Sequence, residues 1–72
     1  MTPAQCRMAR AGLRVSLQDI SGASLVSKST ILRFEGGKEI NPVLHRALRT
    51  HLERLGAIFP ENGVQFREGE LA

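Results

Sequence analysis

The sequence predicts an all-α domain of four to five short helices followed by a small C-terminal β-hairpin. Helix start and stop residues recur at short intervals, apolar residues between them keep helical spacing, and Asn62-Gly63 separates two short apolar runs. The 72 residues are 42% apolar with Phe as the only aromatic type, enough for one small core. We therefore expect a helical domain over 1–56, a hairpin at 57–67 that packs on it or serves dimerisation, and a disordered tail over 68–72.

The first helix is predicted to begin at Pro3 and to run to about residue 12. Thr2 is a typical N-cap residue and Gln5 follows three residues later, which makes a capping box, and proline is favoured at the first helical position. A single cysteine cannot close an internal disulfide, so we expect Cys6 to be a small buried residue. The predicted core face holds Cys6, Ala9 and Leu13, and a separate basic row holds Arg7, Arg10 and Arg14.

Two more short helices follow, joined by a very short turn. The first begins after Ser16, which Asp19 answers in a second capping box. The other is "KSTILRFE", which Ser27 caps and Gly36-Gly37 ends. The residues of this region that we expect to face the core are Leu17, Ile20, Ser24, Val26, Ile31 and Phe34, with Leu17 only half-buried.

The fourth helix is predicted between the cap Asn41 with Pro42 and the stop residue Gly56. Its apolar stripe comprises Leu44, Ala47, Leu48, Leu52 and Leu55, and its polar side comprises His45, Arg46, Arg49, Glu53 and Arg54. The following "AIF-PENG-VQFR" reads as two short strands around a turn. A lone hairpin is marginal in water, so we expect it to pack on the helices or to pair with a second chain.

The second and third helices, with their very short connection, have the plan of a helix-turn-helix. The segments "TPAQCRMAR", "SLQDIS", "VSKSTILRFEGGK" and "NPVLHRALRTHLERLG" resemble, in order and spacing, the XRE-type family of phage Cro and lambda-repressor-like DNA-binding domains. The resemblance covers about residues 2 to 56. It implies a small bacterial or mobile-element transcriptional regulator that binds double-stranded operator DNA as a homodimer, with the third helix in the major groove.

The resemblance also implies which residues approach DNA. They are Gln18, Ser27, Lys28, Ser29, Thr30, Arg33 and Lys38. Short hydroxyls and an exposed lysine at a helix start suit phosphate oxygens and base edges, although an ordinary solvated first turn has the same composition. Arg10 and Glu35 match the positions of a structural pair that links the first and third helices of family members, and we expect that pair to stabilise the fold.

Two leucines depart from the family pattern and leave a second function open. Leu25 stands where family members often have glycine at positive φ, a backbone conformation that is costly for leucine. Leu32 is predicted to point outward, where its methyl groups suit either thymine or a protein partner. The alternative function is an antiactivator or antitoxin-like protein that binds another regulatory protein through an apolar patch of Leu17, Leu25, Val26 and Leu32. A structural or accessory subunit is a third interpretation.

Charge and composition narrow the classes of function that the protein can have. Residues 1–55 carry nine basic and four acidic side chains (net +5), and residues 56–72 carry one and three (net −2), which permits binding to a polyanion. His45 and His51 fall on different sides of a helix with no acidic or cysteine cluster beside them, so we expect no metal and no cofactor. No catalytic set is visible, and the glycines of "EGGK" lack phosphate-loop spacing, so we expect no enzyme. Without a long apolar run or signal-peptide core, we expect a cytoplasmic protein outside the membrane.

Overall fold

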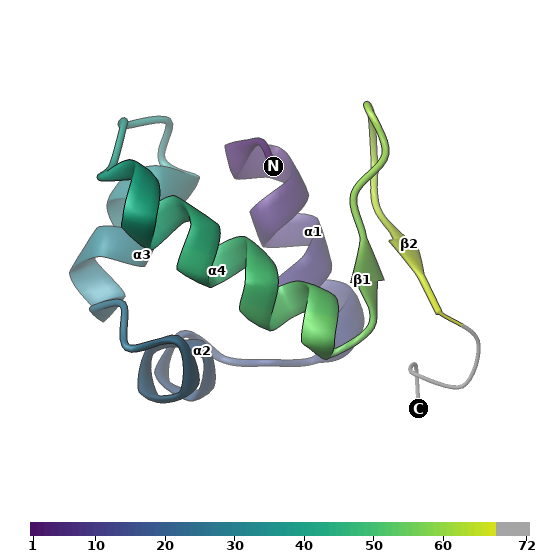
Figure 1. Cartoon of the computed structure of the whole chain (residues 1–72), viewed down its shortest axis with the longest axis horizontal. Helices are drawn as coiled ribbons and strands as arrows, with labels where there is room; N and C mark the ends of the chain where they lie inside the picture. The colour runs from purple at the N-terminus through teal and green to yellow at the C-terminus, as the bar shows by residue number, and fades with distance from the viewer. Residues whose placement is uncertain (68–72) are drawn as a thin grey trace.

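The computed structural model describes residues 1–67 and arranges them as four helices and one two-stranded antiparallel sheet (Figure 1). The helices are α1 (Pro3–Leu13), α2 (Leu17–Ser24), α3 (Lys28–Glu35) and α4 (Pro42–Arg54), and the strands are β1 (Ala57–Ile58) and β2 (Gln65–Phe66). The predicted mostly helical class with a small C-terminal sheet is confirmed. The tail expected to be disordered, 68–72, lies outside the described residues.

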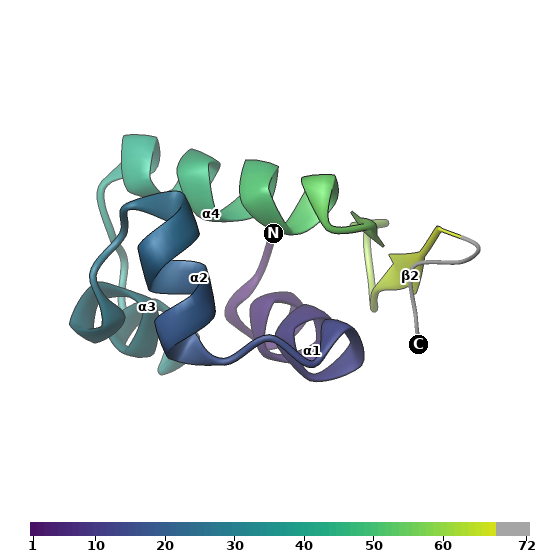
Figure 2. The same cartoon turned by 90° about the horizontal axis from the view of Figure 1, so that it is seen from below.

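Figure 2 shows α4 along one side of the molecule and α1 and α3 along the other, with α2 reaching from that side toward α4. α1 packs against α3, α2 packs against both α3 and α4, and α4 packs against β1. In both views α3 and the sheet lie at opposite ends of the molecule. One side of α3 therefore stays open to solvent, away from the hairpin.

Each helix begins where the sequence predicts, because each cap satisfies backbone donors that the first turn leaves unpaired. In α1 and α2 the side chain of the third helical residue also accepts a hydrogen bond from the backbone N–H of the cap, so both predicted capping boxes are present. The cap residues are Thr2, Ser16, Ser27 and Asn41, and their side chains accept hydrogen bonds from the N–H groups of Gln5, Asp19, Thr30 and Val43, respectively.

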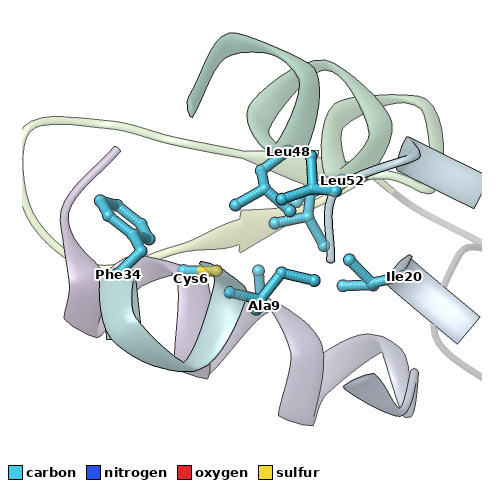
Figure 3. Packing of buried hydrophobic residues seen from close by; sticks show 9 residues of the cluster. Cys6, Ala9, Ile20, Phe34, Leu48 and Leu52 are labelled. Carbon is cyan, nitrogen blue, oxygen red and sulfur yellow. The ribbon is translucent and has the colours of Figure 1, made fainter. Parts of the chain in front are cut away.

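The apolar core lies between α4 and the other three helices. Figure 3 shows Leu48 and Leu52 of α4 facing the side chains that α1 and α2 direct inward. The buried apolar residues are Cys6, Ala9, Ile20, Val26, Ile31, Phe34, Leu48, Leu52 and Ala57, and those packed at their margin include Leu13, Leu17, Leu44 and Ala47. The helical periodicity of the sequence therefore identified most of the core, while Ala57 belongs to the sheet.

The hairpin is fixed to α1 by a close approach of Phe66 to the helix backbone. Its strands hold only two residues each, shorter than the predicted runs, with Ala57 opposite Phe66. A Cβ atom placed on Gly12 would come within 2.2 Å of the Phe66 ring. Gly12 thus leaves the space that the ring needs, and the hairpin lies against α1.

Candidate nucleic-acid interface

α3 turns one side to the core and the other to solvent. Its buried residues are Ile31, Phe34 and Glu35, and its exposed residues are Lys28, Ser29, Leu32 and Arg33. Ser29 and Arg33 are four residues apart, so they project from the side of the helix opposite the core. None of the exposed side chains between Lys28 and Glu35 is acidic. The outward side of α3 is therefore basic, with one large apolar side chain in it.

Hydroxyl groups at the start of α3 bind one another. Ser27 Oγ accepts a hydrogen bond from the Thr30 N–H at 3.2 Å and donates one to Thr30 Oγ1 at 2.8 Å. Ser29 Oγ lies 3.2 Å from the same Ser27 oxygen. This network holds the first turn and leaves Lys28, which forms no ion pair among the described residues, as the free charge at the helix start.

Arg10 and Glu35, the expected structural pair, connect α1 to α3 through two parallel bonds. Arg10 Nε lies 2.7 Å from Glu35 Oε2, and Arg10 Nη2 lies 2.8 Å from Oε1. The guanidinium of Arg7 also donates to the Glu35 backbone carbonyl. Two of the three arginines in the predicted basic row on α1, Arg7 and Arg10, therefore bind Glu35 at the C-terminal end of α3.

The carboxylate of Glu35 stays ionised although it is buried. Burial alone would raise its pKa, but hydrogen bonds from Arg10 and Cys6, with the charges of Arg10 and Arg7, hold the pKa below its ordinary value. The same contact acts oppositely on Cys6, whose Sγ lies 3.3 Å from Glu35 Oε2. Burial, together with that carboxylate, raises the pKa of the Cys6 thiol to about 12. Cys6 is thus a protonated structural residue at neutral pH, as its position on the core face predicted.

The connection between α2 and α3 consists of residues 25–27, and its first residue has a left-handed backbone. Leu25 has φ 62° and ψ 24°, and its N–H donates to the Ser21 carbonyl at 3.0 Å to end α2. The side chain of Leu25 is 87% exposed, so burial does not compensate the conformational cost. The positive φ expected at this position is therefore present with leucine in place of glycine, and the backbone of Leu25 is strained.

The prediction that Val26 belongs to the alternative protein-binding patch is wrong. The helical pattern placed it toward the core, and the structure agrees: Val26 is 1% exposed, because it fills the space where α2 turns into α3. Leu17 is half-buried at the margin of the core. The exposed part of the patch consists chiefly of Leu25 and of Leu32, which is 54% exposed.

The residues implied to approach DNA lie on three segments. Gln18 is exposed in the first turn of α2, and Lys38 is exposed in the loop after α3. The others belong to the cap and the body of α3, where Thr30 is half-buried and Ser27, Lys28, Ser29 and Arg33 are exposed. Helical periodicity brings Ser29 and Arg33 to one side of α3 and places Lys28 on the neighbouring side with Leu32.

Sequence reasoning missed a second role of Gln5. Its side chain completes the capping box, and it is also 4% exposed with its amide donating to the carbonyls of Pro60 at 2.7 Å and Gly63 at 2.9 Å. These bonds fix the hairpin turn on α1. Because the partners are 55 and 58 residues away, no local pattern in the sequence indicates them.

His45 differs from its predicted place on the polar side of α4. It is half-buried, with its ring 4.8 Å from the Phe34 ring and its Nε2 2.9 Å from the Met1 carbonyl oxygen. Met1, which precedes α1, contacts His45 there. Helical periodicity could not predict this contact because Met1 lies outside the helices. His45 therefore joins α4 to α3 and to the start of the chain.

Two hollows lie elsewhere on the surface of residues 1–67. A hollow of about 490 Å³ beside the end of α3 is lined by Phe34, Ile40 and His45 among others, and one of about 320 Å³ between α2 and α4 includes Arg46 and Arg54. In the same residues no three His, Cys, Asp or Glu side chains gather as metal ligands. None of the helices in this part of the chain has the length and apolarity to cross a bilayer.

No protein-family model matches this chain, and a search of curated proteins also finds no match. A function is therefore inferred from the residues of α2 and α3 and from their geometry.

Proposed function

We propose that the protein is a small transcriptional regulator resembling the XRE-type, Cro and lambda-repressor-like domains, in which α2 and α3 act as a helix-turn-helix. The observation that supports it best is the outward side of α3, which carries Lys28 and Arg33 and no exposed acid. An α-helix with its side chains is about 10–12 Å in diameter, which matches the width of the DNA major groove. In this proposal α3 enters that groove of a double-stranded operator.

The charges around α3 favour a polyanion. Lys28, Arg33 and Lys38 are exposed basic residues on or next to the helix, and Arg10 pairs with the acid of α3, Glu35. Glu39, the exposed acid beside Lys38, offsets one of these charges and leaves the region net positive. The exposed acid of α2, Asp19, is held at its helix start by the capping box. Phosphate contacts of exposed lysine and arginine release counterions, so they provide affinity that falls as salt rises.

Two copies suit this function better than one. A single module of this size buries little DNA surface, whereas two modules centred about 34 Å apart meet successive turns of one face of the duplex. The proposal therefore includes a homodimer on an operator with two half-sites.

The test is salt-dependent DNA binding by matched charge variants. The purified protein is titrated with duplexes from its native locus and with duplexes selected from a random pool, between about 50 and 200 mM salt. The double variant Lys28→Gln with Arg33→Gln should lose most of its affinity and show a shallower salt dependence. The control, Arg46→Gln with Arg54→Gln, removes the same charge from α4 and should bind nearly as well as the unaltered protein.

Two results would contradict this function. If no duplex binds at micromolar protein and low salt, the protein does not read DNA. If both double variants lose affinity equally, the binding is general attraction to a polyanion and α3 has no special part in it.

A second candidate function keeps the fold and changes the partner. It is favoured by Leu25, which is 87% exposed in a strained backbone, and by Leu32 nearby in the chain on α3. A non-glycine residue in a strained backbone is more common at functional sites than elsewhere, and it is this strain that singles out Leu25. In this candidate the protein is an antiactivator or antitoxin-like protein that binds another transcription regulator through Leu25 and Leu32.

This candidate predicts that Leu25→Asp and Leu32→Asp each abolish co-purification of one defined partner from native cells while the helical circular dichroism spectrum stays unchanged. Lys28→Gln should leave that partner bound. Retention of the partner by both aspartate variants would exclude the leucine surface as the binding site.

A further inference from the structure

Leu32 is an exposed apolar side chain between two cations. It occupies the fifth position of the eight-residue α3 and is 54% exposed. Lys28 lies one helical turn before it on the same side, and Arg33 follows it directly. One exposed leucine is ordinary on a protein surface, so exposure alone indicates nothing. Its place in the middle of the helix that the proposed function puts into the major groove makes it informative.

The first turn of α3 leaves base recognition to other residues. Ser27 donates its only hydroxyl proton to Thr30, and residues 28–30 include no Arg, Asn or Gln, so Lys28 is the one long side chain of this turn that can reach a base edge. The second turn differs. Arg33 is exposed without an ion pair among the described residues, and Leu32 beside it presents two methyl groups. Leu32 and Arg33 therefore give the second turn of α3 its own means of discriminating bases, beside Lys28 in the first turn.

The base edges in the major groove offer one apolar group that a leucine can meet. Among the four ordinary bases this is the C5 methyl group of thymine, and 5-methylcytosine carries the same group. An arginine forms its best paired hydrogen bonds with O6 and N7 of guanine. A leucine against a C5 methyl group removes both apolar surfaces from water, whereas uracil or cytosine leaves part of the leucine unmatched.

We propose that Leu32 reads the C5 methyl group of a pyrimidine and that Arg33 reads the guanine of a neighbouring base pair. Side chains one residue apart on a helix project about 100° apart, so the two residues meet different base pairs. This inference rests on the proposed function, since it requires α3 to lie in the major groove.

The experiment removes the methyl group from the DNA. Duplexes that bind are first selected from a random pool, and each thymine of the selected site is then replaced in turn by deoxyuridine, which lacks only the C5 methyl. At one position the affinity of the unaltered protein should fall about fourfold, the value of one buried methyl group. Leu32→Ala should bind more weakly and be insensitive to that replacement. Leu25→Ala, which truncates the other leucine that is exposed within residues 1–67, should keep the full sensitivity.

Two further arms identify the source of the methyl group and the role of Arg33. If the selected pyrimidine is cytosine, 5-methylcytosine should bind about fourfold more tightly than cytosine, and this gain should vanish in Leu32→Ala. Replacement of the neighbouring guanine by 7-deazaguanine, which lacks the N7 acceptor, should weaken the unaltered protein about fivefold and leave Arg33→Ala unaffected.

The outcomes separate this inference from the function beneath it. If no duplex is selected, the proposed function fails and the inference fails with it. If duplexes are selected but neither deoxyuridine nor 5-methylcytosine changes affinity at any position, or if Leu32→Ala responds as the unaltered protein does, the inference alone is overturned. Circular dichroism of Leu32→Ala checks that the helices are intact in that comparison.

Discussion

At the scale of single residues, Leu25 has a backbone that would suit glycine and a side chain that buries almost nothing. Its φ of 62° places a Cβ atom against its own backbone, which costs about 1 kcal/mol. Leu25→Gly should therefore be about 1 kcal/mol more stable than Leu25→Ala, because both lose the same exposed side chain and only alanine keeps the strain. Urea unfolding of the two variants measures the difference. Equal stability, or a more stable alanine variant, would mean that the turn relaxes without cost.

Glu35 predicts how stability depends on acid. Its pKa in the folded chain is lower than the ordinary value of 4.5, so its contribution is complete above about that pH and is lost as the pH falls through the folded pKa. Glu35→Gln should cost about 2 kcal/mol at pH 7 by removing the charged bonds to Arg10. The stability difference between the two proteins should shrink steadily below pH 4.5. Urea unfolding between pH 7 and pH 3 tests this, and a constant difference would contradict it.

At the scale of elements, the contact between α1 and the hairpin depends on a missing side chain. Gly12→Ala places a Cβ atom 2.2 Å from the Phe66 ring, so the ring must move away and loosen the hairpin, at a cost of about 1–3 kcal/mol. Gly22→Ala in α2 is the matched control, because nothing lies within 4 Å of its added Cβ atom. It should gain about 1 kcal/mol from helix propensity alone.

Thermal unfolding compares the two alanine variants, and NMR shifts of Phe66 report where the ring lies. We expect Gly12→Ala to be less stable than the unaltered protein and Gly22→Ala more stable. If both substitutions stabilise the protein and the Phe66 resonances do not move, the hairpin does not depend on close packing over Gly12.

The elements that the sequence predicted well are those set by local chemistry. Cap residues such as Thr2 and Ser16 act within one helical turn, and the outward position of Leu32 follows from helical periodicity, so both were visible in the sequence. The bond from Gln5 to the hairpin was not, because it joins distant parts of the chain, and the strands proved shorter than the predicted runs. The core position of Val26 was predicted as well, and its burial excludes it from the patch in which the alternative function also placed it.

At the scale of the whole molecule, the dimensions of the chain bear on how two copies would bind one operator. Its Cα atoms span 30 × 25 × 18 Å. Half-sites one helical turn apart have centres about 34 Å apart, so in the proposed function two copies with their 30 Å axes along the duplex would meet through their side chains. In that arrangement binding to an operator with this spacing should be cooperative.

The spacing of the half-sites tests this arrangement. Insertion of about 5 base pairs, half a helical turn, places the second copy on the opposite face of the duplex, where the two copies no longer touch. Cooperativity should disappear, while the affinity of each isolated half-site stays the same because the contacts of α3 with its groove are unchanged. Titrations of duplexes with one half-site, with two in phase and with two out of phase measure all three quantities. Equal affinity of the two-site duplexes at both spacings would show that the copies bind independently, and the role of the homodimer in operator recognition would then be lost.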